Sequence, residues 1–229
     1  MNIIAIILAR GGSKSIPKKN IINFCGEPLI CWTIKQAKNS KFISDVWVSS
    51  DNDEILEISE KSGSKIIKRP KNLSNDSSSS TSALIHAVNK IEKIVKKIDL
   101  IIVLQATSPV REIKDIDSAI GIFKEKKYDS LFTSTKFEGR FIWKQNKMKK
   151  LTSINYDFKK RKRRQEIEEQ FLENGSFYIF KPIILKKYSN FLGGKIGTFT
   201  MDMWKSFEID EYSELEICEL FMKKYILKK

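Results

Sequence analysis

A segment near the N-terminus joins an apolar run to a loop of cations. Residues 3 to 9 are all apolar and lead into Arg10-Gly11-Gly12-Ser13-Lys14-Ser15-Ile16-Pro17-Lys18-Lys19-Asn20. An uninterrupted apolar run fits a central parallel strand, which is covered on both faces, and glycines let the following backbone approach a ligand closely. Exposed amides, a hydroxyl and several cations suit phosphate oxygens. We therefore expect phosphates to be bound by Arg10, Gly11, Ser13, Lys14 and Lys19.

The loop follows neither of two common phosphate-binding patterns. The spacings G-x-x-x-x-G-K-[ST] and G-x-G-x-x-G are both absent from it. A solvated turn whose lysines bind nothing is therefore the alternative interpretation, and Lys18 in particular fits a plain surface position.

Polar side chains also follow a second apolar run, residues 100 to 104. In open α/β sheets, ligands bind outside the carboxyl ends of the parallel strands. The polar residues that follow this run should therefore lie at the mouth of the site. They are Gln105, Thr107, Ser108 and Arg111.

Two carboxylates near the C-terminus, Glu208 and Asp210, are two residues apart in an apolar, strand-like context. Alternation places both side chains on one face of an extended chain. Such a pair can bind Mg²⁺, which prefers oxygen ligands completed by substrate phosphate and water. Taken alone, the pair would also fit an ordinary surface or the first turn of the helix that follows.

A basic run, residues 159 to 164, precedes Gln165. Arg164 is the candidate for binding a carboxylate, because a guanidinium offers a fixed bidentate fork that lysine cannot imitate. Gln165 and Asn174 could add hydrogen bonds to the same ligand. The alternative interpretation is a nuclear-localisation or nucleic-acid patch.

Composition limits the class of protein. A chain of 229 residues with 41% hydrophobic and 31% charged residues fits one soluble domain with a substantial core. We find no run of about 18 apolar residues and no secretory signal, so we expect a cytoplasmic protein without a membrane partner. The net charge of +14 invites a nucleic-acid interpretation. No known nucleic-acid-binding motif accompanies it, and an anionic small substrate explains the clustered cations equally well.

Alternating strand and helix patterns predict a mostly parallel sheet of βαβ units. Strands are expected at residues 2 to 8, 45 to 50, 65 to 68, 99 to 104 and 129 to 135. Helices are expected at residues 28 to 38, 53 to 62, 80 to 97 and 113 to 126, with Pro28 in a first turn and Gly63 as a C-cap. Residues 137 to 174 are an irregular excursion from this core. The chain returns at residues 175 to 180, followed by a strand at 196 to 200 and a helix at 212 to 225.

The string L-A-R-G-G-S-K-S-I-P-K-K-N resembles the N-terminal signature of the acylneuraminate cytidylyltransferases. Further segments resemble that family in the same order, so the resemblance spans nearly the whole chain. They are Lys68-Arg69-Pro70, Asn75-Asp76-Ser77-Ser78-Ser79-Ser80, Leu104-Gln105-Ala106-Thr107-Ser108-Pro109-Val110-Arg111, Arg163-Arg164-Gln165, Glu173-Asn174-Gly175-Ser176-Phe177-Tyr178 and Ser206-Phe207-Glu208-Ile209-Asp210.

The resemblance implies a Rossmann-like nucleotidyltransferase fold over residues 1 to 229, with residues 137 to 174 as a dimerisation and sugar-binding arm of a homodimer. It implies transfer of CMP from CTP to the anomeric hydroxyl of a sialic acid, with Mg²⁺ as cofactor. The catalytic residues would be Arg10, Lys19 and Asp210. Asn20, Arg69, Ser78 and Ser80 would join the phosphate loop in binding CTP. Gln105, Ser108, Arg111, Arg164, Gln165 and Asn174 would bind the sugar, and Asp210 and Glu208 the metal.

Departures from the family pattern keep alternatives open. Ala106 and Glu208 replace the more usual proline and aspartate, and Leu172 occupies a position where many bacterial members have arginine. The acid sugar could therefore also be legionaminic acid, pseudaminic acid, KDN or Kdo. Kdo enzymes usually carry a metal-binding aspartate in the segment after Gln105, and this chain has none there. The serines before residue 80 could also simply cap the following helix.

Overall fold

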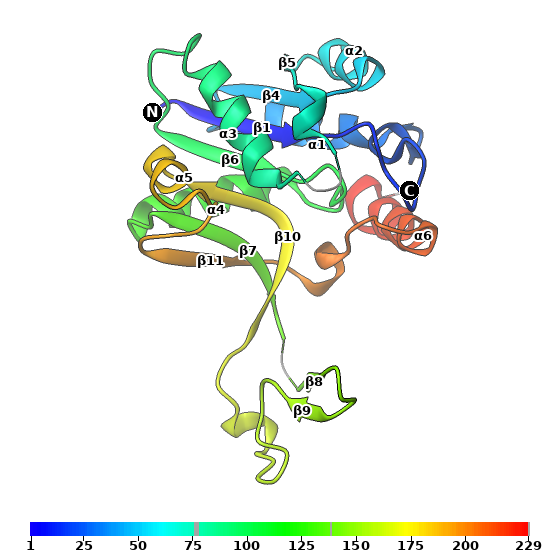
Figure 1. Cartoon of the computed structure of the whole chain (residues 1–229), viewed down its shortest axis with the longest axis vertical. Coiled ribbons are helices and arrows are strands. Elements are labelled where there is room, and N and C mark those ends of the chain that lie inside the picture. Colours follow the sequence, from blue (N-terminus) through cyan, green and yellow to red (C-terminus); the bar gives the residue numbers. More distant parts are fainter. Residues whose placement is uncertain (76–77, 138, 229) are drawn as a thin grey trace.

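The computed structural model describes residues 1–75, 78–137 and 139–228, and its centre is a seven-stranded sheet (Figure 1). The strand order is β11-β7-β10-β6-β1-β4-β5. Only β10 runs antiparallel to its neighbours, β6 and β7, so the expected mostly parallel sheet is confirmed. The strands are β1 Ile3–Leu8, β4 Asp45–Ser50, β5 Lys65–Lys68, β6 Leu100–Leu104, β7 Ser130–Lys136, β10 Phe171–Phe180 and β11 Ile196–Thr200. Two short pairs are β2 Asn23–Phe24 with β3 Glu27–Pro28, and β8 Trp143–Gln145 with β9 Leu151–Ser153.

Helices cover both faces of the sheet, because successive side chains of each buried strand point in opposite directions. Ile3, Ala5 and Ile7 of β1 pack with α1 and α4, whereas Ile4 and Ile6 pack with α3 and α5. The α-helices are α1 Leu29–Lys38, α2 Asp53–Lys61, α3 Ser80–Ile91, α4 Ile113–Glu125, α5 Pro182–Tyr188 and α6 Tyr212–Phe221. No helix in the described part of the chain is long and apolar enough to cross a membrane.

Five helix boundaries differ from the prediction, and two of these differences are only that α2 and α4 each end one residue early. The helix expected to reach residue 97 ends at Ile91, since Val95 and Ile98 turn onto the core cluster of α3 and the chain must reach β6 by Leu100. Pro28 lies at the N-cap of α1 rather than inside its first turn. The last helix changes at Met222 into a π-helical segment, Met222–Leu227.

The ends of α2 and α3 carry the caps that their sequences suggest. The Asn52 side chain accepts a hydrogen bond from the Ile55 amide, and the Ser79 hydroxyl accepts one from the Ser82 amide. Gly63 follows α2 at a φ of +83°, as expected of a C-cap glycine. Asp76 and Ser77, part of the predicted serine tract, lie outside the described residues.

The excursion at residues 137 to 174 leaves the sheet between β7 and β10, and Figure 1 shows it as an arm that projects away from the body. In the arm, β8 and β9 pair only with each other among the described strands. The return strand β10 begins at Phe171, earlier than expected, and has a register shift between Glu173 and Tyr178 where Gly175 adopts a φ of +65°.

Candidate active site

Two adjoining pockets open at the carboxyl ends of β1 and β6, and both are lined by Leu8, Arg10 and Gln105. The cationic pocket, of about 370 Å³, adds Gly12, Ser13, Lys14, Ser15, Lys19, Asn20, Ala106, Thr107, Glu208 and Asp210. The serine pocket, of about 320 Å³, adds Arg69, Leu73, Ser74, Asn75, Ser78, Ser79, Ser80, Val103 and Phe191. The location agrees with the strand-end rule used on the sequence.

Close packing explains the glycine at the start of the phosphate loop. The Gly11 amide donates to the Asp51 carboxylate at 3.0 Å, and a Cβ atom on Gly11 would lie 2.8 Å from Cβ of Asn52, the cap of α2. Asn20 is buried, and its side-chain amide donates to the Arg10 carbonyl at 3.0 Å. Asn20 therefore stabilises the conformation of the phosphate loop through this bond, and it also lines the cationic pocket.

Lys19 and Asp210 meet inside the cationic pocket. The Lys19 ammonium lies 2.7 Å from the Asp210 carboxylate, and the Asp210 side chain is 66% exposed. The backbone of Asp210 is fixed independently, since its carbonyl accepts from the Ser15 hydroxyl and its amide donates to Glu214 at 2.7 Å. The carboxylate is therefore held in place but open to a ligand. By contrast, Lys18 forms an exposed ion pair with Glu54, as a surface lysine would.

Glu208 is the more buried of the two carboxylates. It accepts a hydrogen bond from the Thr107 hydroxyl at 2.8 Å. Burial, followed by the nearby charge of Asp210, raises the pKa of Glu208 above its usual value, although the Thr107 bond and Lys19 oppose this. Their alternation suggested that Glu208 and Asp210 lie on a strand. They lie instead on irregular backbone after the 3-10 turn Met203–Ser206. Both nevertheless line the cationic pocket.

The carboxylate pair suits a hard divalent cation that is completed by substrate. Mg²⁺ is commonly bound through one or two carboxylates together with substrate phosphates. The raised pKa of Glu208 marks negative charge that its surroundings do not fully compensate, and a cation would compensate it. Among the described residues no group of three or more His, Cys, Asp or Glu residues forms a metal cage, so a cation here would need ligands from substrate or water.

Arg69 dominates the serine pocket. It is only 5% exposed, and its Nε and Nη2 atoms have no hydrogen-bond partner among the described residues. Burial lowers the pKa of Arg69, while Asp51 opposes and Arg10 adds to this shift. Unused guanidinium donors in a pocket suit a ligand that presents carbonyl or ring-nitrogen acceptors. The Ser78 hydroxyl, in the same pocket, lies 2.9 Å from the Asn72 carbonyl oxygen and 2.6 Å from the Asn75 side-chain oxygen, either of which can accept its one proton.

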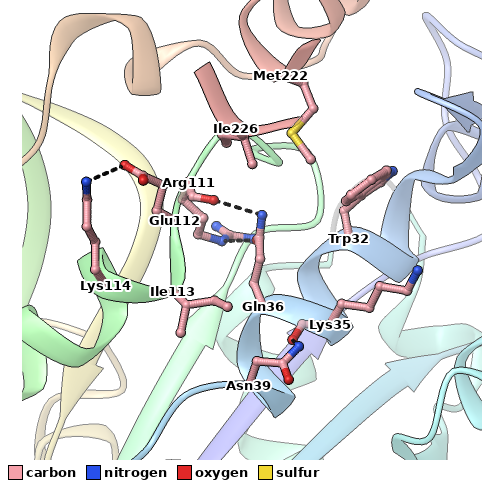
Figure 2. A pocket seen from close by; sticks show the side chains of 10 residues that line it. All are labelled: Trp32, Lys35, Gln36, Asn39, Arg111, Glu112, Ile113, Lys114, Met222 and Ile226. Carbon is pink, nitrogen blue, oxygen red and sulfur yellow. Dashed lines mark hydrogen bonds and ion pairs between the residues drawn. The ribbon is translucent and has the colours of Figure 1, made fainter. Parts of the chain in front are cut away.

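Arg111 is placed differently from its predicted role. It is fully buried, and all five of its N–H donors are used: Nε on Gln36, Nη1 on the carbonyl and hydroxyl of Ser176, and Nη2 on Thr33 and the Gln105 carbonyl. Figure 2 shows its pairing with Gln36 among the residues that line a separate cavity. Burial lowers the pKa of Arg111 to about 9. Arg111 thus supports Gln105 from behind and has no donor left for a sugar.

The other predicted sugar residues fall into two places. Gln105 lines both pockets, and Ser108 lies behind it, 2% exposed, with no partner for its hydroxyl among the described residues. Asn174 is buried beside Ser206, to whose hydroxyl it donates at 3.4 Å. Gln165 lies in the arm, in the 3-10 turn Arg164–Glu166. The Arg164 side chain lies outside the described part of the structure. Within this one chain, no described arm residue lines either pocket.

Sequence reasoning missed two contributors, Asp51 and Phe191, and one contact of a third residue, Thr107. Asp51, which anchors the phosphate loop, follows strand β4 directly, so the strand-end rule could have identified it. Thr107 was recognised as a polar residue at the mouth of the site, but its bond to Glu208 spans 101 residues of chain. Phe191 enters the serine pocket through packing on Tyr178 and Phe180, and no sequence signal marks it.

The doubly covered, mostly parallel sheet with polar, cation-rich pockets at its strand ends defines an open α/β protein with its candidate site at the carboxyl edge of the sheet. A family model described as "Cytidylyltransferase" matches residues 4–228, and the chain therefore belongs to the cytidylyltransferase family.

The chain is similar in sequence to two relatives and shares its fold with one solved structure. It is 36% identical over 212 residues to N-acylneuraminate cytidylyltransferase A of Danio rerio. The matched region covers 91% of this chain and 48% of the relative, so the chain spans about half the length of that protein. It is 30% identical to a pseudaminic acid cytidylyltransferase of Campylobacter jejuni, over 97% of both chains. The structure of CMP:2-keto-3-deoxy-manno-octonic acid synthetase complexed with CTP shares the fold, with a TM-score of 0.72 at 19% identity over 99% of this chain and 100% of the other.

Proposed function

We propose that the chain transfers CMP from CTP to the anomeric hydroxyl of a sialic acid or a related nonulosonic acid and releases pyrophosphate. The observation that carries this proposal is the cationic pocket, in which the Lys19–Asp210 pair and Glu208 face the phosphate loop at the ends of β1 and β6. Membership of the cytidylyltransferase family and the names of the two relatives support the nucleotide and the class of acceptor.

The reaction is an in-line displacement at the α-phosphorus of CTP. A bond forms from the anomeric 2-hydroxyl oxygen to phosphorus, the hydroxyl proton is released, and the bond to the bridging oxygen of pyrophosphate breaks. Negative charge then accumulates on the leaving pyrophosphate. Arg10, Lys14 and Lys19 border the same pocket and stabilise that charge, with the backbone amides and hydroxyl around Ser13 as further donors. Positioning and electrostatics supply most of the catalysis.

Mg²⁺ is part of the proposal, with Asp210 as the direct ligand and Glu208 as the second carboxylate. When bound, it would act as a Lewis acid toward the phosphate oxygens. Lys19 balances the charge of Asp210 and lines the same pocket as the phosphate loop, so its ammonium lies where phosphate oxygens would bind. Thr107 keeps Glu208 directed at the same space through its hydroxyl.

We assign the serine pocket to the cytidine half of CTP. Its buried guanidinium, Arg69, has unused donors for the carbonyl and ring-nitrogen acceptors on the edge of a pyrimidine. Ser78 and Ser80 lie nearby for the base and ribose, next to the capped start of α3. Phe191 adds an apolar surface against which a planar base can pack.

The sugar acid is proposed to bind beyond Gln105, in a site completed by the arm of a second copy. Gln105 and Ser108 come from the body, Asn174 comes from β10 where the arm returns to the sheet, and Arg164 and Gln165 come from the arm, with Arg164 on the sugar carboxylate. The chain would then act as a cytoplasmic homodimer without a nucleic-acid partner. The exposed aromatic side chains of the arm support an interface, because they need a surface to cover them.

One experiment tests both substrates: pyrophosphate release measured over a panel of nucleoside triphosphates and nonulosonic acids with Mg²⁺ present. We expect turnover with CTP and a sialic acid. Turnover with pseudaminic or legionaminic acid alone would keep the cytidylyltransferase but change its acceptor. Absence of release with every acid, together with salt-steep binding to nucleic acid, would contradict the proposal.

A further inference from the structure

Lys205 is a buried lysine outside both pockets. It is 3% exposed, and its ammonium lies 2.7 Å from the Glu112 carboxylate and 2.8 Å from that of Asp115. Asp115 is itself only 6% exposed. Burial of charge is costly unless the partners are well placed, so this cluster is a specific feature of the fold rather than a chance surface contact.

The cluster joins the two segments that carry the chemistry. We call residues 203 to 210, which end in Glu208 and Asp210, the carboxylate loop, and residues 105 to 115 the strand-end segment. Lys205 lies near the beginning of the carboxylate loop, three positions before Glu208. Glu112 and Asp115 form the capping box at the start of α4, at the far end of the strand-end segment. Their bonds to Lys205 therefore tie the two segments together away from the pocket.

A second attachment joins the same segments at the pocket itself. The Ile209 amide donates to the Thr107 carbonyl at 2.8 Å, and the Thr107 hydroxyl donates to Glu208 at 2.8 Å. The carboxylate loop has no regular strand or α-helix of its own between residues 203 and 210. Ile209 packs in a core cluster and Asp210 is held by Ser15 and Glu214, and these two attachments add to that support. Lys205 supplies the attachment at the start of the loop, and its side chain is buried.

We propose that Lys205 is a positioning residue for the carboxylate pair: its buried ion pairs hold the carboxylate loop where Glu208 and Asp210 face the cationic pocket together. A buried ion pair is a weak source of stability, since apolar side chains of similar volume often stabilise as well. Its effect here is on geometry, and groups that orient metal ligands from behind change metal affinity about 10–100-fold when removed. This inference rests on the proposed function, because it assumes that the carboxylate pair binds a divalent cation.

The test removes the charges together, because Lys205→Met alone would leave Asp115 buried without its partner. We expect the double variant Lys205→Met/Asp115→Asn to fold, with the Asn carbonyl still able to cap α4. Its half-saturating Mg²⁺ concentration for pyrophosphate release should rise about tenfold. Its dissociation constant for Mn²⁺, measured by electron paramagnetic resonance with CTP present and no sugar acid, should rise by a similar factor.

The matched control is Lys186→Met/Glu92→Gln, which removes a surface ion pair of the same 2.7 Å length far from the carboxylate loop and should change neither value. Asp115→Asn alone, which leaves Lys205 paired with Glu112, should give a smaller rise and decides the question if the double variant does not fold. Unchanged Mg²⁺ and Mn²⁺ values in the folded variants would overturn the inference. Asp210→Asn is measured in parallel: if it too left metal binding unchanged, the metal site of the proposed function would be at fault.

Discussion

The pockets and the arm of this chain are built in opposite ways. Around the pockets, several polar side chains are buried and bonded: Arg111 is fully buried, Lys205 is 3% exposed and Asn174 is 6% exposed. In the arm, apolar side chains are exposed: Trp143 is 42% exposed and Phe158 is 51% exposed. The two regions therefore invert the usual rule that polar groups face water and apolar groups do not.

This difference separates the part of the candidate site that one chain forms by itself from the part that we propose a second copy completes. Buried hydrogen bonds and ion pairs within the chain fix the groups proposed to bind phosphate and metal, so that part of the site is preorganised. The arm aromatics pack on one another, with Trp143 and Phe158 ring centroids 5.4 Å apart, but this contact leaves both rings about half exposed. The difference predicts that body variants will change chemistry whereas arm variants will change assembly and acceptor binding.

The largest effect is expected from Asp210→Asn, which removes the charge of the proposed metal ligand and keeps its shape. We expect kcat/KM to fall by about 10³, at the upper end of losses for a preorganised electrostatic group. Added Mg²⁺ should restore little of it. Pyrophosphate release titrated with Mg²⁺ measures both values, and normal Mg²⁺ dependence would mean that the ion is bound elsewhere.

Arg10→Ala should lower kcat/KM by about 10², because one cation that stabilises the leaving pyrophosphate is lost. Lys19→Ala should behave similarly. Lys18→Ala is the matched control from the same loop, since Lys18 pairs with Glu54 at the surface and should leave turnover near wild type. Steady-state kinetics with varied CTP concentration measure these values. Near wild-type turnover of Arg10→Ala would contradict the proposal that Arg10 binds the phosphates of CTP.

Arg164→Ala tests the arm. A charge-assisted hydrogen bond contributes about 1.5–3 kcal/mol, so KM for the sugar acid should rise roughly tenfold to a hundredfold. KM for CTP should stay within about twofold, and the dimer should remain intact. Equal increases of both KM values would show that Arg164 does not act on the sugar carboxylate.

Trp143→Ala tests assembly. If the arm packs on a second copy, removal of a central aromatic should weaken the dimer by about 2 kcal/mol or more, which is some thirtyfold in its dissociation constant. Light scattering over a concentration series measures this. An unaltered wild-type monomer with full activity at micromolar concentration would contradict the homodimer.

The smallest effect concerns Glu208 and pH. Because burial raises its pKa in the folded state, the ionised side chain destabilises the fold at neutral pH. The fold carries no penalty from this group below the pKa that Glu208 has in the unfolded chain, where the side chain is neutral in both states. The penalty develops, and stability is lost, as pH rises through the raised pKa of the folded state. Glu208→Gln should therefore raise the melting temperature of the ligand-free protein at pH 7, and the gain should vanish near pH 4. In a chain of this size 1 kcal/mol corresponds to about 2–4 °C, so we expect a shift of a few degrees at most. A lower melting temperature of Glu208→Gln than of wild type at pH 7 would contradict the interpretation that the charge of Glu208 is not fully compensated.

Residue patterns were sufficient to predict a mostly parallel sheet and the edge at which the pockets open. Apolar runs such as residues 3 to 8 and 100 to 104 became central strands, because a run that is apolar at every position must be covered on both faces. The polar residues that follow those runs, such as Arg10 and Gln105, then had to meet at one edge, since parallel strands end on the same side. The role of each residue in binding CTP, sugar or metal stays a prediction.

Tertiary packing determines which polar side chains line a pocket and which are used in hydrogen bonds within the protein. Arg111 was expected at the mouth of the site because it follows an apolar strand, and the family resemblance implied that it binds the sugar. Its donors are instead used by Gln36, Thr33, Gln105 and Ser176. Thr107 and Glu208, or Lys205 and Asp115, are about 90 to 101 residues apart in sequence, and no local pattern pairs them. Such contacts depend on how distant segments pack against each other, and local spacing carries no information about that packing.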